Sequence, residues 1–310
     1  MRPLKTIFAG TPAFAVPSLQ ALLGHSGIDV VAVYTQPDRP AGRGQAVRES
    51  EVKLAAAAHG LPIEQPASMR DPAALERFLA HDCELLVVTA YGQILPTAVI
   101  DAPARGAINV HASLLPRWRG AAPIQRALMA GDEQTGVTIM RIVERLDAGP
   151  MLLRATLGIE PDDTGGSLHD RLAALGGQAL RAALDALIAG TLHETVQDES
   201  LVTYARKIER ADRLIDWTLD AEALSRQVRA LNPAPLAIAS LGGLTLNVIA
   251  ATAVSHLDTH APGTVIGVDD DGIVVACGSG ALRLTVVQPP GKRAMNAREF
   301  LNGYRKHLPL

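Results

Sequence analysis

The stretch Lys5-Thr6-Ile7-Phe8-Ala9-Gly10-Thr11-Pro12 decides the fold. Its first five residues are mostly apolar and run directly into glycine, threonine and proline, as a buried strand does where it enters a loop. Further apolar runs follow at 29–34, 85–89 and 107–110, with helical stretches between them. Because strands that alternate with helices form parallel sheets with crossover helices, we predict an α/β fold with a mainly parallel, open sheet in the first half of the chain.

Helix signals lie between and after these runs. Ser50 can cap a helix that ends near Gly60, and Asp71-Pro72 places a capping side chain and a first-turn proline at the start of another. A further helix is expected after Ala121, and residues 164–188 are rich in leucine and alanine at helical spacing. We expect this long helix to close the first domain.

The pattern of predicted secondary structure changes beyond residue 204. One helix, at 221–231, precedes several short strands that are separated by Gly-Gly, Asp-Asp-Asp-Gly and Gly-Ser-Gly turns. Roughly four or five antiparallel strands within about 55 residues suggest a small OB-like β-barrel, an architecture that binds nucleic acids. We therefore expect a catalytic domain at 1–189, a polar linker at 190–206 and a barrel domain at 207–310.

Composition narrows the class of protein. Hydrophobic residues make up 48% of the 310 and charged residues 20%, which excludes disorder for the bulk of the chain. Cys83 and Cys277 lie far apart and form no CxxC pair, so we expect neither a disulfide framework nor a cysteine-rich zinc site, and a cytoplasmic location fits. Residues 230–257 carry no Asp, Glu, Lys or Arg, but prolines and glycines divide them into pieces too short to span a membrane. Two strands and a turn are expected there.

Charge points to local patches and not to a general field. The formal net charge is −3, which gives no global signal for a polyanionic partner. Between 283 and 306, however, the sequence contains one acidic residue, Glu299, and six basic residues. The basic residues are Arg283, Lys292, Arg293, Arg298, Arg305 and Lys306. Such a run can be a solvated face, and it would also suit a phosphate backbone.

A glycine directly after a first strand raises the question of a dinucleotide site. The stretch Gly10-Thr11-Pro12-Ala13-Phe14-Ala15 lacks the second and third glycines of G-x-G-x-x-G, so the backbone is not suited to a close approach to a pyrophosphate. A nicotinamide-dependent enzyme is therefore disfavoured. The chain also contains no GxxxxGK[ST], HExxH or GxSxG motif.

The chemistry is expected after the strand at 107–110. Asn109 and His111 are two residues apart on an extended segment, so their side chains project from one face, at the sheet edge where open α/β folds bind ligands. Asp147 adds a carboxylate in a loop that ends in Gly149. An amide donor, an imidazole and a carboxylate would suit acyl transfer to an amine. By spacing alone, a structural or solvent-facing histidine remains an alternative.

Several segments, in order along nearly the whole chain, carry a family resemblance. They are 8–12, 36–44, 90–96, 109–116, 117–125, 146–149, 197–199, 215–217 and 288–292. Together they resemble the folate-dependent formyltransferases, and in particular those members that act on methionyl-tRNA. The resemblance implies a Rossmann-like formyltransferase domain followed by an OB-like domain that binds tRNA.

The resemblance also implies a reaction and its residues. A formyl group would pass from 10-formyltetrahydrofolate, the co-substrate, to the α-amine of methionyl-initiator tRNA, without a metal and with no membrane or obligate protein partner. Asn109, His111 and Asp147 occupy the catalytic positions of the family. The segment that contacts the folate corresponds to Ser113, Leu114, Leu115 and Pro116. The loop that lines the pterin pocket through its backbone corresponds to Tyr91, Gly92, Ile94 and Leu95.

Two regions are expected to contact the tRNA. The loop from Gln36 to Arg48 is longer than the usual connection between a strand and a helix, and long loops of this kind are often functional. In the family it reaches the acceptor end of the tRNA, so we assign Arg39 and Arg43 to this contact. In the barrel domain, Lys292 and Arg293 are the corresponding candidates.

Two other interpretations remain open at this stage. The first is another folate-dependent enzyme, which formylates an amine of a nucleotide-sugar or purine precursor or releases formate by hydrolysis; the loop around Arg43 and the barrel argue against it. The second is a non-catalytic RNA-binding protein that keeps the same scaffold. It would bind tRNA without forming a product, and the intact set of Asn109, His111 and Asp147 argues against it.

Overall fold

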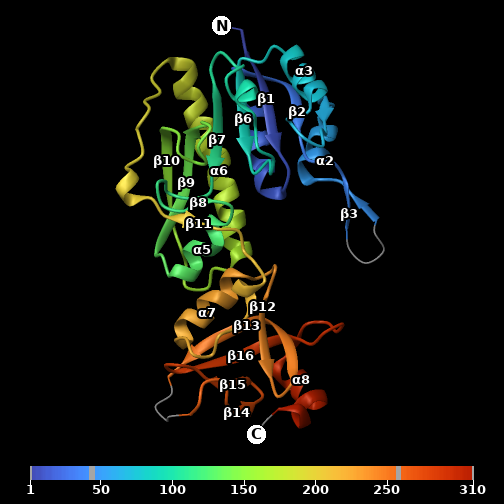
Figure 1. Cartoon of the computed structure of the whole chain (residues 1–310), viewed down its shortest axis with the longest axis vertical. Helices are drawn as coiled ribbons and strands as arrows, with labels where there is room; N and C mark the ends of the chain where they lie inside the picture. Colours follow the sequence, from blue (N-terminus) through green and yellow to red (C-terminus); the bar gives the residue numbers. More distant parts are fainter. Residues whose placement is uncertain (1, 42–45, 256–259, 309–310) are drawn as a thin grey trace. The chain divides into compact units, whose positions relative to one another are not determined.

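The computed structural model describes residues 2–41, 46–255 and 260–308. It divides into two compact units (Figure 1). Unit 1 comprises Met1–Gly120, Thr135–Gly158 and His169–Tyr204, and unit 2 comprises Ala121–Gln134, Ile159–Leu168 and Ala205–Leu310. The domain boundaries suggested by the sequence, at 189 and 207, remain a proposal.

Unit 1 is built on a mainly parallel sheet, as predicted. In the part of the chain that the structure describes, seven strands follow the order β10-β9-β7-β6-β1-β2-β5. Parallel pairing joins β1 to β2 and β6, β6 to β7, and β2 to β5, whereas β7 pairs with β9 in antiparallel orientation. The strands are β1 (Leu4–Gly10), β2 (Ile28–Tyr34), β5 (Ile63–Glu64), β6 (Leu85–Thr89), β7 (Ala107–His111), β9 (Gln134–Arg141) and β10 (Met151–Gly158).

The helices begin where the sequence places their caps. The Ser50 side chain accepts a hydrogen bond from the Lys53 backbone N–H (3.1 Å), and the Asp71 carboxylate accepts one from Ala73 (3.0 Å). Figure 1 shows α2 and α3 beside the blue strands β1 and β2. The helices of the first 200 residues are α1 (Val16–Leu23), α2 (Glu51–Ala58), α3 (Pro72–Ala80), α4 (Thr97–Ile100), α5 (Pro123–Ala130) and α6 (Gly165–Ala189), with 3₁₀ turns η1 (Ala13–Ala15) and η2 (Glu199–Leu201).

Helix α6 is long and apolar enough to cross a membrane by length and composition. Within unit 1 it packs as a core helix instead, with Leu172, Leu180 and Leu184 fully buried. Gly177 permits a close approach to α1, because an added Cβ would lie 2.8 Å from the backbone oxygen of Pro17. The close packing of this helix explains its apolar composition.

Unit 2 contains the antiparallel strands that the hairpin signals predict. The sheet has the order β12-β13-β16-β15-β14, and β17 pairs with β16. Gly242 and Gly243, both at positive φ, form the two-residue turn between β12 and β13, so residues 230–257 contain the two strands and turn expected there. The elements are β12 (Ala237–Leu241), β13 (Leu244–Val254), β14 (Val265–Asp269), β15 (Gly272–Ala276), β16 (Ala281–Gln288), β17 (Met295–Asn296), α7 (Ala221–Ala230), α8 (Ala297–Tyr304), η3 (Ala211–Arg213) and η4 (Arg305–His307).

Some short elements have no counterpart among the predictions. Helix α8 begins at a capping box in which Asn296 and Glu299 exchange hydrogen bonds. The 36–48 loop contains a small antiparallel hairpin, β3 (Arg39–Ala41) with β4 (Ala46–Arg48). Two further two-residue strands are β8 (Arg119–Gly120) and β11 (Tyr204–Ala205).

Candidate active site

The candidate catalytic residues lie where the parallel strands end. Asn109 and His111 belong to β7, which lies between β6 and β9 in the sheet, and His111 is the last residue of the strand. Because successive side chains of a strand alternate between its faces, Asn109 and His111 project from the same face. The His111 side chain is only 6% exposed, whereas Asn109 is half-buried. The strand thus holds one ring rigidly and leaves one carboxamide accessible.

The hydrogen bonds of His111 determine which ring nitrogen is available. Its Nε2 lies 3.0 Å from the backbone oxygen of Trp118. A carbonyl oxygen can only accept, so Nε2 carries a proton. The other nitrogen, Nδ1, lies 3.7 Å from Oδ2 of Asp147. Nδ1 is therefore the nitrogen that faces the carboxylate, and it is the one available to exchange a proton or to bind a substrate.

One of the two carboxylate oxygens of Asp147 accepts a hydrogen bond from the backbone. It lies in the loop between β9 and β10 and has a positive φ of 48°, a left-handed conformation that aspartate tolerates better than most residues. Its Oδ2 accepts a hydrogen bond from the Gly120 backbone N–H at 2.8 Å. Its Oδ1 accepts no hydrogen bond from any residue that the structure describes, and the side chain is 12% exposed. The free oxygen is placed to accept a proton or to hold a water molecule.

Asn109 is the third candidate catalytic residue, and its carboxamide N–H groups are available as hydrogen-bond donors. Its carboxamide makes no hydrogen bond within the described part of the chain. A half-buried amide on the same strand face as His111 can donate to an oxygen on which negative charge develops. The structure therefore brings Asp147 to His111, and the alternation of β7 puts Asn109 on the same side. Such a set suits acyl transfer to an amine.

The predicted folate-contacting segment forms a tight turn after β7. The Ser113 hydroxyl donates to the Arg117 backbone oxygen (2.6 Å), and the hydroxyl of Thr138 donates to the Ser113 backbone oxygen (2.7 Å). Ser113, Leu115 and Pro116 are buried, and Leu115 packs with Met140 and Met151. Leu114 is the most accessible member of the four. Most of this segment thus supports the site, and Leu114 is the side chain best placed to touch a ligand.

The predicted pterin loop, residues 91–95, leaves the neighbouring strand β6 at the same edge of the sheet. The Tyr91 backbone oxygen accepts hydrogen bonds from Thr11 Oγ1 (2.9 Å) and Gln36 Nε2 (3.1 Å), which fixes the start of the loop. Tyr91 is buried, Leu95 is half-buried, and Gly92 and Ile94 are exposed, Ile94 by 74%. Within the described residues, the backbone groups of 92–95 make no hydrogen bond to the protein. These groups are free to bind a flat heterocycle.

The tRNA candidates in unit 1 are only partly described. Arg39 lies in β3 with an exposed side chain and forms no ion pair with any described residue. Arg43 lies outside the described residues. At the base of the loop, Asp38 pairs with Lys53, and the Gln65 amide donates to Asp38 (2.8 Å). These hydrogen bonds hold the pKa of Asp38 below its ordinary value.

In unit 2 ion pairs decide which basic residues keep a free charge. Arg283 pairs with Asp269, Arg298 with Asp270, and Arg293 with Glu299 through two hydrogen bonds (2.7 and 3.1 Å). The exposed Lys292, Arg305 and Lys306 form no ion pair with any described residue.

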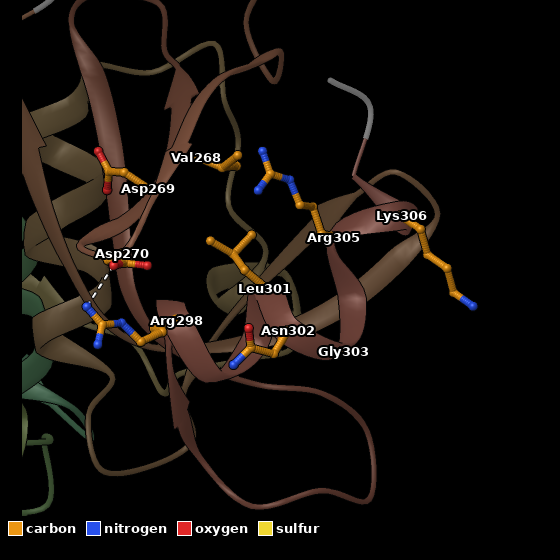
Figure 2. Close-up of a pocket in the computed structure, with 9 residues that line it drawn as sticks. All are labelled: Val268, Asp269, Asp270, Arg298, Leu301, Asn302, Gly303, Arg305 and Lys306. Carbon is orange, nitrogen blue, oxygen red and sulfur yellow. Dashed lines mark hydrogen bonds and ion pairs between the residues drawn. The ribbon is translucent and has the colours of Figure 1, made fainter.

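Arg305 and Lys306 line a cavity of about 580 Å³ beside α8. In Figure 2, Lys306 points away from the cavity and Arg298 is joined to Asp270. The free positive charge of the tail is thus concentrated on three side chains.

Three residues without a role assigned from the sequence hold the candidate catalytic pair, His111 and Asp147. Trp118 and Gly120 bind His111 and Asp147 through their backbone, and Gln197 binds the Asp147 loop through its side chain. The only sequence signal was their position within segments that carry the family resemblance. Among the described residues, no group of three or more His, Cys, Asp or Glu side chains could hold a metal ion.

Comparisons with known proteins identify the family of the chain. Residues 4–184 match the family model described as "Formyl transferase", and residues 207–305 match "Formyl transferase, C-terminal domain". The methionyl-tRNA formyltransferase of Methylococcus capsulatus is 54% identical over 301 residues, which is 97% of this chain and 97% of that protein.

Solved structures share the fold at lower identity. An N-formyltransferase from Helicobacter canadensis, in complex with folinic acid and dTDP-3-aminofucose, has a TM-score of 0.69 at 17% identity, over 92% of this chain and 98% of its own. HypX from Aquifex aeolicus, in complex with tetrahydrofolic acid, has a TM-score of 0.67 at 17% identity, over 98% of this chain and 48% of its own.

Proposed function

The chain belongs to the formyl transferase family, and from this premise we propose that it transfers the formyl group of 10-formyltetrahydrofolate to the α-amine of methionyl-tRNA. The product is N-formylmethionyl-tRNA, and the tRNA is the initiator that begins translation. The observation that carries the catalytic assignment is the contact between His111 Nδ1 and Asp147 Oδ2, at the carboxyl edge of the parallel strands.

The first role of the site is to stabilise the developing charge. As the neutral amine attacks the formyl carbon, negative charge gathers on the formyl oxygen. The carboxamide of Asn109 donates to that oxygen, and a protonated His111 donates from Nδ1, because Nε2–H is committed to Trp118. Both groups are preorganised by β7, so little reorganisation is needed during the reaction.

The second role is to move a proton. The attacking amine must lose a proton, and the departing N10 must gain one. Asp147 keeps Oδ2 on the Gly120 N–H and presents Oδ1, which makes no bond to the described protein. We propose that Asp147 accepts the proton directly or through a water molecule.

The loop at 91–95 and Leu114 would hold the folate. 10-Formyltetrahydrofolate supplies a formyl carbon that is already activated by its bond to N10. The unpaired backbone groups of 92–95 fit the polar rim of a pterin, and Leu95, Ile94 and Leu114 offer apolar contacts. No metal is needed by this scheme.

The tRNA is proposed to bind through local positive charge. Arg39 and Arg43 of the 36–48 loop contact the acceptor end, and Lys292 contacts the phosphate backbone together with Arg293, whose charge is already shared with Glu299. Because affinity then depends on few phosphate contacts, its salt dependence is modest. We propose that the reaction takes place in the cytoplasm and needs no membrane or obligate protein partner.

The direct test of the function is a comparison of formyl acceptors. The protein is incubated with 10-formyltetrahydrofolate and either charged initiator tRNA, charged elongator methionyl-tRNA, or amino-sugar nucleotides. After ester hydrolysis, we expect N-formylmethionine mainly from the initiator tRNA. Formylation of the sugar amine alone, or tRNA binding with no formylated product, would contradict the proposal.

Gly149 offers a test of how closely the Asp147 loop must be placed. A Cβ at Gly149 would lie 2.0 Å from the backbone oxygen of Arg141, so Gly149→Ala must displace the loop. We expect kcat to fall about 10- to 100-fold, since displacements near 1 Å can cost that much. Steady-state kinetics measures kcat, and equilibrium dialysis measures folate binding, which we expect to persist.

Gly24→Ala serves as the control for this variant. An added Cβ at Gly24 would make ordinary contact with the Gln20 backbone oxygen at 3.4 Å, in the same unit. We expect wild-type kcat there. An unchanged kcat in Gly149→Ala would mean that the position of Asp147 does not matter.

A further inference from the structure

The segment 195–203, which the sequence suggests is part of a linker, contacts the loop of Asp147 and the turn whose Trp118 backbone oxygen holds His111. Thr195 exchanges two backbone hydrogen bonds with Met151 (both 2.8 Å), at the start of β10. Gln197 reaches the loop of Asp147, and Thr203 reaches the turn that carries Trp118. We propose that Gln197 is a positioning residue for formyl transfer, which holds Asp147 against His111. This inference rests on the proposed function.

The Gln197 side chain is fully used. Its Nε2 donates to two backbone oxygens, those of Asp147 and Gly149, each at 2.8 Å. Its Oε1 accepts from Nε (3.0 Å) and Nη2 (2.8 Å) of Arg119. Carbonyls only accept and a guanidinium only donates, so the orientation of the amide is determined. The side chain is only 4% exposed.

Arg119 is the buried residue that holds Gln197 through hydrogen bonds. Its side chain is fully buried, and its Nη2 also donates to Glu199 (2.9 Å), which in turn pairs with Arg145. The hydrogen bonds from Arg119 and Arg145 hold the pKa of Glu199 below its ordinary value, so the carboxylate stays charged. The network therefore joins the residues on both sides of the Asp147 loop.

The backbone around Arg119 reaches the catalytic pair itself. The residue before it, Trp118, accepts from His111 Nε2, and the residue after it, Gly120, donates to Asp147. Trp118 has a positive φ of 65°, and its N–H donates to Thr203 Oγ1 at 2.9 Å. The path thus runs from Asp147 through Gln197, Arg119 and its neighbours to His111. Without the Gln197 donor, the oxygens of Asp147 and Gly149 would face no partner, and the loop would move.

Gln197→Glu tests this role selectively. The substitution keeps an oxygen for Arg119 and replaces the amide donor with an oxygen that repels the two carbonyls. We expect kcat for formyl-methionyl-tRNA formation to fall about 10- to 100-fold. The KM values for 10-formyltetrahydrofolate and for methionyl-tRNA should stay within about twofold, because Gln197 belongs to neither of the proposed ligand contacts.

Gln227→Glu is a matched control. The Gln227 amide also donates to two backbone oxygens, those of Asp212 (2.8 Å) and Leu214 (3.1 Å), but within unit 2. This variant should lose stability and keep wild-type kcat. An equal loss of kcat in both variants would show general destabilisation and would overturn the proposal. A wild-type kcat in Gln197→Glu, or a loss confined to KM, would also overturn it.

Thr203→Val provides a second, milder variant if Gln197→Glu fails to fold. It removes only the acceptor for the Trp118 N–H, on the His111 side of the same network. We expect kcat to fall about 3- to 10-fold with unchanged KM values, and an unchanged kcat would overturn the proposal.

Turnover by the wild-type chain in the same assay tests the function, whereas the ratio of variant to wild type tests the inference. The two failures are therefore distinguishable.

Discussion

His111→Ala is expected to lower kcat for formyl transfer by roughly 100- to 10,000-fold, the range typical of a positioned proton-transfer group. In the proposed mechanism the ring supplies the Nδ1–H for the formyl oxygen, and its Nδ1 lies 3.7 Å from Asp147 Oδ2. Single-turnover rates with saturating 10-formyltetrahydrofolate measure the loss. Folate binding should persist, because the folate contacts are assigned to the 91–95 loop and Leu114.

His25→Ala is the matched control for this prediction. His25 is also a buried histidine with a carboxylate partner, since its Nε2 lies 3.1 Å from Asp185 and its Nδ1 accepts from the Gly27 N–H. Its removal should lower the melting temperature and leave kcat unchanged. Near-native turnover in His111→Ala, or an equal loss in His25→Ala, would remove the catalytic assignment.

Asn109→Ala is expected to lower kcat about 100- to 1000-fold, as the loss of one oxyanion donor does in other enzymes. The carboxamide has no hydrogen bond within the described chain, so its removal leaves no buried partner unsatisfied. We therefore expect the melting temperature to change little, and calorimetry checks this. A large loss of stability with normal kcat would assign Asn109 to the fold.

Asn109→Asp sharpens the same test. It preserves shape while placing a negative charge where negative charge develops, so kcat should fall at least as far as in the alanine variant. A more active aspartate variant would mean that Asn109 does not donate to the formyl oxygen.

The central strands could be predicted from the sequence because their signals are local. The strand expected at 85–89 is β6, and β7 extends one residue beyond the predicted 107–110, to His111. The alternation of β7 also predicts that Asn109 and His111 share a face. Capping by Ser50 and Asp71 was likewise readable, since a cap depends on residues two or three positions away.

The support of the site could not be predicted, because it depends on contacts between distant residues. Gln197 and Arg119 meet across 78 positions, and nothing in either segment signals the pairing. Trp118 and Asp147 adopt positive φ without being glycine, so their conformation comes from the tertiary structure. Strand β10 has a different reason for not being predicted: half of its residues are polar or small, which weakens the apolar signal.

The charge available on the basic residues of unit 2 could not be predicted from the sequence either, because it depends on ion pairs in the folded structure. The sequence suggests a run of six basic residues, but the structure pairs Arg283, Arg293 and Arg298 with carboxylates. Counting residues therefore overstates the charge available to a phosphate backbone. Of the two residues proposed to bind tRNA in unit 2, Lys292 forms no ion pair with any described residue, whereas Arg293 shares its charge with Glu299.

The measurement that tests the account most directly is a double-mutant cycle on kcat with His111→Ala, Asp147→Asn and the variant that combines them. Residues that act as one unit are strongly non-additive, since the loss of either disables both. We predict that the double variant is within about threefold of the slower single variant. If the two losses multiply instead, His111 and Asp147 act independently, and the proposed catalytic pair is contradicted.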